Sequence, residues 1–354
     1  MLIGKNRKFM KKVCIIGPFG FGKELLNGQT VKCIFVKEVL EKGYGKDEIK
    51  TIDTFGGVTV LIKCLYKLFL NFFRCENIVM LPAQNGVRIF TPFCLFINRI
   101  FNRQLHYIVI GGWLAEFTKV HSKLANRLKK YDKIYVETST MKKALEKQGF
   151  NNIVLLPNCK ELPILKEEEL VYSHRKPYKL CTFSRVTPKK GIDDAINAVK
   201  CINEEAGKII FVLDIYGQVD EAEIEWFNKI KERLPSYIHY CGLVPYDKSV
   251  EVLRNYFALL FPSRFYTEGI PGTLIDAYAA GVPVISSRWE SFLDVVDENI
   301  VGLGFEFGNT EELKEILKYI SENPEYLNRM KKSCLKKAEL YSSKNVLQIL
   351  KQHL

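Results

Sequence analysis

Two carboxylates stand at one predicted helix start that is rich in glycine. Glu268 precedes the helix, Pro271 and Gly272 open it, and Asp276 lies eight residues after Glu268. Amides at the start of a helix have no partner within the helix, so they attract anions and above all phosphate. Because helical side chains lean toward the N-terminus, we expect Asp276 to approach the same helix start as Glu268. Amides that bind phosphate, beside carboxylates that bind hydroxyl groups, predict a site for a phosphorylated sugar.

The elements around this segment are a predicted strand, a helix and a second strand. Residues 256–263 form an apolar run that ends in Pro-Ser, and residues 282–287 form another. Gly281 ends the helix between them, as glycine often does. A simpler interpretation is also open, in which the helix is buried through its small residues and Glu268 only balances the helix dipole.

A second cluster of charges follows the predicted strand at residues 178–186. Arg185 stands at the end of that strand, and Lys190 and Gly191 open a helix. A guanidinium fork and a lysine ammonium at this spacing can bind one diphosphate together. The alternative is a surface turn with ordinary charges.

A glycine-rich loop follows the first predicted strand. Its sequence GPFGFGKE, at residues 17–24, approaches the P-loop pattern G-x-x-x-x-G-K, but Glu24 takes the place of the Ser or Thr that holds Mg²⁺. We interpret Gly20 and Gly22 as positions where loop amides approach phosphate or sugar. A plain tight turn and an ATP-hydrolysing P-loop are the alternatives.

The chain has the composition of a globular protein that is long enough for two domains. Of its 354 residues, 47% are hydrophobic and 26% are charged. Its ten cysteines include no C-x-x-C pair, which indicates reduced thiols rather than a disulfide framework. No apolar run reaches the roughly 18 residues of a membrane-spanning helix. We therefore expect a cytoplasmic protein.

The positive charge of the chain lies in its first half. Residues 1–160 carry 27 Lys or Arg against 11 Asp or Glu, whereas residues 161–354 carry 25 against 29. A basic half indicates an anionic partner, which is nucleic acid, an anionic membrane surface or a pyrophosphate-bearing substrate. The alternative is ordinary solvated surface charge in a lysine-rich protein. No nucleic-acid-binding motif is present, so we do not expect nucleic acid. The amphipathic residues 56–73, with Lys63 and Lys67, either lie on an anionic bilayer or cover a sheet as a core helix.

Apolar runs alternate with helical patterns in both halves of the chain. This alternation predicts two doubly wound α/β domains, each with a parallel sheet covered by helices on both faces. The predicted domains are residues 1–165 and 166–335, followed by a C-terminal helix at residues 336–354. The predicted strands are residues 12–17, 48–54, 77–83, 105–112, 132–137 and 152–158, then 178–186, 209–217, 237–244, 256–263, 282–287 and 301–308.

The segment that starts at Glu268 resembles the signature of the family-4 retaining glycosyltransferases of the GT-B fold, of the type that builds bacterial surface polysaccharides. The family's Glu and Gly-x-Pro stand here as EGIP from residue 268, and its Ala-x-Ala-x-Gly-x-Pro-Val follows Asp276 as AYAAGVPV. Asp276 replaces the second Glu of the signature and is one methylene shorter.

A second motif of the same family lies around Arg185 and Lys190. The family carries Gly-Arg-Leu, three residues and then Lys-Gly, and assigns phosphate binding to the Arg and the Lys. Ser184 and Val186 replace the Gly and the Leu here.

This resemblance implies a retaining glycosyltransferase that moves a hexose-type sugar from a nucleotide-diphosphate-sugar donor to a glycan or a polyprenyl-pyrophosphate-linked acceptor. It implies two Rossmann-like domains that face a central cleft, with the C-terminal helix crossing back to the first domain. It implies no metal and no cofactor, and the sequence holds no Asp-x-Asp. If the basic half meets a membrane, the protein is peripheral on the inner face of the cell membrane.

The resemblance also assigns residues to the site. Catalytic roles fall to Glu268, Arg185 and Lys190. The donor-binding residues are Gly20, Gly22, Arg185, Lys190, Gly217, Leu243, Glu268, Gly269, Ile270, Pro271, Gly272, Thr273, Leu274 and Asp276. The acceptor-side residues are Gly111, Gly112 and Trp113.

Two departures from the family pattern favour a different class of function. Asp276 shortens the second carboxylate, and Gly111 stands where many relatives carry a His. His106, inside the preceding predicted strand, is expected to be a packed histidine. A non-catalytic GT-B module that binds a nucleotide sugar or a partner protein is therefore the alternative to the enzyme.

Overall fold

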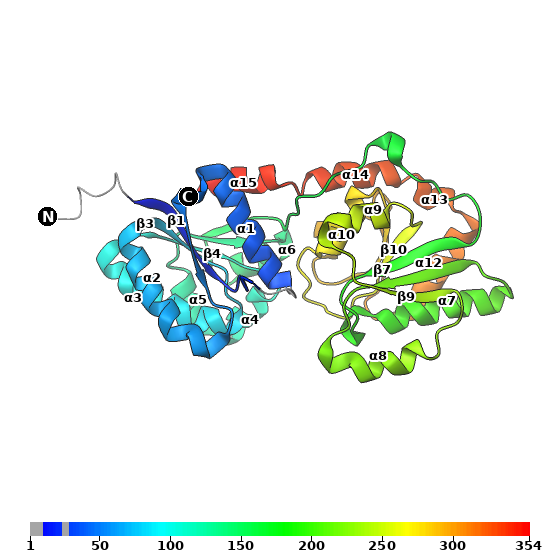
Figure 1. The fold of residues 1–354 in the computed structure, drawn as a ribbon, viewed down its shortest axis with the longest axis horizontal. Helices are drawn as coiled ribbons and strands as arrows, with labels where there is room; N and C mark the ends of the chain where they lie inside the picture. The colour runs from blue at the N-terminus through cyan, green and yellow to red at the C-terminus, as the bar shows by residue number, and fades with distance from the viewer. Residues whose placement is uncertain (1–9, 23–27) are drawn as a thin grey trace. The chain divides into compact units, whose positions relative to one another are not determined.

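The structure is a computed structural model that describes residues 10–22 and 28–354 (Figure 1). The chain divides into two compact units. The first extends to Asn158 and takes up Ser343–Leu354, and the second is Cys159–Ser342. None of the helices in the described part of the chain combines the length and the apolarity needed to span a membrane.

The first unit is built on a six-stranded parallel sheet in the order β2-β1-β3-β4-β5-β6. The strand order reverses beside β1, which is where open α/β sheets bind ligands beyond their carboxyl ends. The strands are β1 (Lys11–Gly17), β2 (Ile49–Asp53), β3 (Cys75–Met80), β4 (Gln104–Ile108), β5 (Lys133–Val136) and β6 (Ile153–Leu155).

Helices cover the sheet of the first unit, and the C-terminal helix α15 packs against α1 (Figure 1). A Cβ at Gly43 on α1 would lie 2.3 Å from Leu347 Cδ1 on α15, so the glycine permits the close approach of the two helices. The helices are α1 (Gly28–Tyr44), α2 (Leu61–Arg74), α3 (Gln84–Phe101), α4 (Leu114–Val120), α5 (Ser122–Leu128), α6 (Ser139–Glu146) and α15 (Ser343–Lys351), with the single turns η2 (Lys46–Glu48) and η3 (Gly57–Val60).

The second unit repeats this architecture with a parallel sheet in the order β12-β11-β10-β7-β8-β9. The strands are β7 (Tyr178–Phe183), β8 (Phe211–Tyr216), β9 (Ile238–Gly242), β10 (Ala258–Phe261), β11 (Val284–Ser287) and β12 (Gly302–Phe305). The helices are α7 (Ile192–Ala206), α8 (Ile224–Lys231), α9 (Ser249–Leu253), α10 (Gly272–Ala279), α11 (Phe292–Val295), α12 (Thr310–Glu322), α13 (Glu325–Asn328) and α14 (Lys331–Glu339). The single turns are η4 (Glu167–Glu169), η5 (Pro188–Lys190), η6 (Glu221–Glu223) and η7 (Tyr246–Lys248).

Two parallel six-stranded sheets confirm the predicted α/β fold class. The central strands are buried on both faces, which is why they read as continuous apolar runs rather than as alternating ones. The predicted strand at residues 105–112 is shorter in the structure, because β4 ends at Ile108.

His106 is fully buried in β4. Its Nε2 lies 3.3 Å from Asn77 Oδ1, and its Nδ1 lies 3.3 Å from the hydroxyl of Tyr135. Burial lowers the pKa of His106 to about 3, and the nearby charges of Lys133 and His353 act in the same direction. The histidine is therefore packed and neutral near pH 7.

The neutral state of His106 predicts a loss of stability in acid. Because its pKa is lower in the folded state than the ordinary value near 6.5, the unfolded chain binds the proton more readily below that pH. We expect this residue alone to lower the free energy of unfolding by about 1.4 kcal/mol for each pH unit below about 6.5. Hydrogen exchange of β4 in urea at several pH values measures this slope. The slope should be smaller in His106→Gln, and equal slopes in both proteins would contradict the prediction.

Candidate active site

The helix start that the sequence singled out is formed by α10. Pro271 caps the helix with an extended backbone, and Leu274 N donates to Pro271 O at 3.1 Å. Thr273 Oγ1 is buried and, within the described part of the chain, is one of the few buried side-chain oxygens without a hydrogen-bond partner. A buried hydroxyl without a hydrogen-bond partner, beside amides at a helix start, is typical of a site where a bound ligand supplies the missing partner.

The end of α10 depends on Gly281. Its φ of 64° lies in the left-handed region, and a Cβ there would lie 2.1 Å from Leu170 Cδ2. Most of α10 is buried, including Leu274 and Tyr278. The helix is thus packed in the core, and only its first turn is accessible to a ligand. A ligand site at the helix start and a helix buried through its small residues are therefore compatible interpretations.

Glu268 and Lys190 meet at this helix start, although they are 78 residues apart in the chain. The Glu268 carboxylate is almost fully buried and accepts hydrogen bonds from Lys190 Nζ and, at 2.8 Å, from Ser263 Oγ. Lys190 Nζ also lies 5.2 Å from the centre of the Phe261 ring. The structure therefore brings together two of the residues to which the resemblance assigns catalysis.

The turn before α7 holds Lys190 in place through Gly191. Gly191 has a φ of 67°, and a Cβ on it would lie 1.8 Å from Pro262 O. The backbones that follow β7 and β10 touch at this point, because β7 and β10 are neighbouring strands. This contact is what carries Lys190 to the residues that follow β10.

Asp276 lies beside the same helix start but is held by other residues. Lys160 Nζ donates to both carboxylate oxygens, at 2.8 and 2.5 Å, and Ser249 Oγ donates to Oδ1 at 3.1 Å. Burial raises the pKa of Asp276, and the Lys160 ammonium and the hydrogen bonds oppose this shift without cancelling it. The resemblance assigns this carboxylate to donor binding, but in this structure both of its oxygens have protein partners.

Lys160 is a residue of the site that the sequence analysis missed. It lies between the predicted strands at residues 152–158 and 178–186, and it is 116 residues from Asp276. A Cβ at Gly272 would lie 3.0 Å from Lys160 Cε, so the lysine stem crosses the first residue of α10. The missing side chain of Gly272 provides the space for it.

Removing Lys160 should leave the buried carboxylate of Asp276 without its cationic partner. We expect Lys160→Met to lower the free energy of unfolding by about 3 kcal/mol at pH 8, because breaking a buried ion pair leaves one charge uncompensated. The loss should shrink as the pH falls, since burial then lets Asp276 take up a proton more readily than it does in the unfolded chain. Chemical denaturation at pH 8 and pH 5 tests this. Adding Asp276→Asn should restore part of the stability at pH 8, and no restoration would contradict the prediction.

Arg185 does not join the cluster of Lys190 and Glu268 in this structure. It is exposed, and its guanidinium lies 3.3 Å from Asp220. An exposed ion pair of this kind is worth little and is easily exchanged for another anion.

Gly217 and Leu243 lie at the ends of neighbouring strands β8 and β9. Gly217 has a φ of 138°, and a Cβ on it would lie 1.7 Å from Ser184 O. The Tyr240 hydroxyl donates to Gly217 O at 2.9 Å, and Leu243 is exposed. Gly217 is therefore required for the close packing of two loop backbones, whatever else it binds.

The glycine loop of the first unit is organised by Asp53, which the sequence analysis did not single out. The amides of Phe19 and Phe21 donate to its two carboxylate oxygens at 2.8 and 3.2 Å. Gly20 and Gly22 both have positive φ values, of 61° and 79°. The Lys and Glu of the P-loop interpretation, at positions 23 and 24, lie outside the described residues.

The acceptor-side residues lie in the turn after β4. Gly111 has a φ of 81°, Gly112 is buried, and Trp113 Nε1 donates to Ile110 O at 2.9 Å. The Trp113 ring packs edge-to-face against Phe117. Trp113 is thus partly a packing residue of the first unit.

A protein-family model matches most of the second unit. Residues 167–337 match the family model described as Glycosyl transferases group 1. This matched segment is just under half of the chain, and its sequence is similar to that of group 1 glycosyltransferases. The matched segment contains Arg185, Lys190, Glu268 and Asp276, and it begins after Lys160.

Two proteins named as glycosyltransferases also align with this chain in sequence. The chain is 26% identical over 151 residues to the amylovoran biosynthesis glycosyltransferase AmsK of Erwinia amylovora, an alignment that covers 42% of this chain and 37% of that protein. It is 25% identical over 280 residues to the uncharacterized glycosyltransferase MJ1178 of Methanocaldococcus jannaschii, covering 77% of this chain and 73% of that protein.

Solved structures show that the GT-B fold extends over both units. Anabaena Alr3699/HepE in complex with UDP-glucose aligns with a TM-score of 0.73 at 12% identity, covering 96% of this chain and 98% of that chain. The apo form of the lipopolysaccharide outer core galactosyltransferase WaaB aligns with a TM-score of 0.70 at 15% identity, covering 97% and 98%.

Proposed function

We propose that this protein is a retaining glycosyltransferase of family 4. In this proposal it transfers a hexose-type sugar from a nucleotide-diphosphate-sugar to a glycan or a polyprenyl-pyrophosphate-linked acceptor during cell-surface polysaccharide biosynthesis. The observation that carries the proposal is the meeting of Lys190 and Glu268 at the open start of α10. The family match of the second unit, the relative named for amylovoran biosynthesis and the neighbour solved with UDP-glucose support it.

Each part of the α10 start has a role in such a transfer. The bond between the anomeric carbon of the sugar and the donor phosphate breaks, and negative charge grows on the leaving diphosphate. Lys190, Arg185 and the amides of Gly269, Gly272 and Thr273 stabilise that charge, and Glu268 binds hydroxyls of the sugar. Preorganised donors of this kind are often the largest single contribution to catalysis.

The remaining steps need no further group from the protein. The acceptor oxygen bonds to the anomeric carbon on the face that the diphosphate leaves, so the configuration is retained. The acceptor's proton passes to the leaving phosphate. The proposal includes no metal and no cofactor, because cationic side chains and helix amides take over charge stabilisation.

The acceptor is proposed to be presented at a membrane. A polyprenyl-pyrophosphate-linked glycan would place this protein peripherally on the inner face of the cell membrane. The excess of Lys and Arg in residues 1–160 suits a pyrophosphate-bearing partner.

A non-catalytic module that binds a nucleotide sugar is the second candidate. The observation that favours it is the engagement of both Asp276 oxygens by Lys160 and Ser249, which is not the arrangement that the resemblance implies. Both candidates predict donor binding, and only the enzyme predicts turnover.

Thermal unfolding against UDP, GDP, ADP, CMP and their sugars tests donor binding first. A ligand at 100 times its Kd should add about 2.7 kcal/mol to the free energy of unfolding. The enzyme is supported if one nucleotide series stabilises the protein and if the protein then releases that nucleotide from its sugar donor in the presence of a membrane-lipid extract. Stabilisation without release supports the module, and no stabilisation by any compound contradicts both.

A further inference from the structure

Helix α2 is apolar on two opposite sides. One stripe, with Cys64, Leu68 and Phe72, is buried in the core of the first unit. A second stripe faces outward at the same helical spacing and consists of Ile62, Tyr66, Phe69 and Phe73. Ile62 is 83% exposed and Tyr66 is 63% exposed. Covering the sheet accounts for the first stripe and leaves the second unexplained.

Helix α3 packs beside α2 and presents a similar outward stripe. Phe96 is 66% exposed and Ile100 is 63% exposed. The ring of Phe101 lies 4.3 Å from that of Phe73, centre to centre, and so joins the two helices. We refer to the exposed apolar residues of α2 and α3 together as the α2–α3 face.

Basic residues flank both stripes, and acidic residues are nearly absent. On α2, Lys63, Lys67 and Arg74 follow the apolar stripe along one flank. Between Asp53 and Glu116 the sequence contains a single acidic residue, Glu76, in β3. Lys12 donates to that carboxylate at 3.2 Å. The α2–α3 face is therefore both apolar and cationic.

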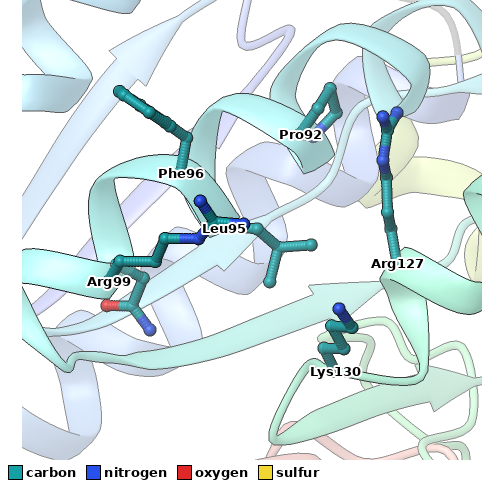
Figure 2. A pocket seen from close by; sticks show the side chains of 7 residues that line it. Pro92, Leu95, Phe96, Arg99, Arg127 and Lys130 are labelled. Atoms are coloured by element: carbon teal, nitrogen blue, oxygen red, sulfur yellow. The ribbon is translucent and has the colours of Figure 1, made fainter.

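A hollow of about 440 Å³ opens between α3 and the end of α5. Three cations line it: Arg99 from α3, Arg127 from α5 and Lys130 from the turn that follows (Figure 2). Leu95 and Pro92 form its apolar wall, and Phe96 stands at its edge. A space of this size beside three exposed cations suits a phosphate group with its ester substituents.

We propose that the α2–α3 face docks the protein on an anionic phospholipid bilayer, with the apolar stripe at the headgroup boundary and a lipid phosphate in the hollow. This inference rests on the proposed membrane location of the acceptor and names the surface that would hold the protein at that membrane. It does not depend on whether sugar transfer occurs. Exposed aromatics and aliphatics beside lysines and arginines are the composition of an interfacial helix.

The chemistry of the face favours a bilayer over other partners. Exposed Ile62 and Ile100 suit acyl chains, whereas a nucleic acid would be bound by charge and by aromatic stacking. A second copy of the same face would oppose cations with cations, which disfavours self-association through it.

Sedimentation with vesicles tests the proposal. The full chain should bind phosphatidylcholine vesicles that contain phosphatidylglycerol, should ignore pure phosphatidylcholine, and should be released as salt shortens the Debye length. The triple variant Arg99→Gln/Arg127→Gln/Lys130→Gln should bind about 100-fold more weakly, since each cation near an anionic surface contributes a severalfold factor. Its control is Lys143→Gln/Lys147→Gln/Lys229→Gln, which changes the net charge equally at exposed positions elsewhere and should differ little from wild type.

A second pair of variants tests the apolar stripe. Ile62→Ser/Phe96→Ser should weaken vesicle binding about tenfold, whereas Leu293→Ser, at an exposed position in the second unit, should not change it. The proposal is overturned if wild type ignores anionic vesicles at low salt, if each variant and its control weaken equally, or if RNA displaces the vesicles at equal phosphate. Donor stabilisation measured on the same variants should stay at the wild-type value, so a failure here is distinct from a failure of the donor site.

Discussion

Replacing Lys190 with alanine is expected to lower the rate of donor turnover by about 10²–10³-fold. Lys190 Nζ stands at the α10 start beside Glu268, where the charge of the leaving diphosphate would develop. Because that charge grows in the transition state, kcat and kcat/KM should fall together. The measurement is release of the nucleoside diphosphate from the donor that the binding panel identifies.

The neighbouring lysine provides a matched control for this experiment. Lys189 is exposed, and Lys189→Ala removes the same charge one residue away. This variant should keep nearly the full rate, and Lys190→Arg should keep part of it. A Lys190→Ala enzyme within about tenfold of wild type, at unchanged thermal stability, would remove Lys190 from the catalytic group.

Replacing Gly191 with alanine is expected to destabilise the second unit by more than about 4 kcal/mol. The added Cβ would lie 1.8 Å from Pro262 O, which is a backbone atom that cannot rotate away. The φ of 67° adds the cost of a left-handed conformation for a residue with a side chain. Denaturation in a Trp113→Phe background measures this effect, because the two remaining tryptophans, Trp226 and Trp289, lie in the second unit.

Gly207 is the control for Gly191 because the two glycines flank the same helix. It caps the end of α7 with a φ of 58°, and no atom lies within 4 Å of the Cβ that alanine would add. Gly207→Ala should therefore cost only the conformational term, about 1–2 kcal/mol. Equal losses in the two variants would show that conformation, and not the contact with Pro262, makes Gly191 necessary.

The sequence was most informative where the chemistry is local. Glu268 and Pro271 lie within about one turn of the start of α10, and Lys190 lies two residues before the start of α7, so spacing alone placed each at the end of an element. Alternating apolar runs likewise predicted both parallel sheets, because strands buried on both faces need uninterrupted apolar sequence. The fold class and the position of the α10 start were therefore predictable.

The partners of these residues were not predictable from spacing. Lys190 reaches Glu268 because β7 and β10 are adjacent in the sheet, and Lys160 reaches Asp276 across 116 residues. Asp53 binds the glycine loop because β2 pairs with β1. Strand order brings these residues together, whereas Lys160 reaches Asp276 past Gly272, which has no side chain to crowd the lysine.

The sequence by itself determined which side chains could do chemistry and which segments would be helix or strand, because these properties depend on residue type and short-range periodicity. Only the tertiary structure decided which carboxylate each lysine meets. It also decided which apolar stripe of α2 is buried and which stays exposed, although both stripes have the same helical period. The physical reason is that the period of a helix shows which of its sides are apolar but not which element packs against each side. That is decided only when sheets and helices pack together.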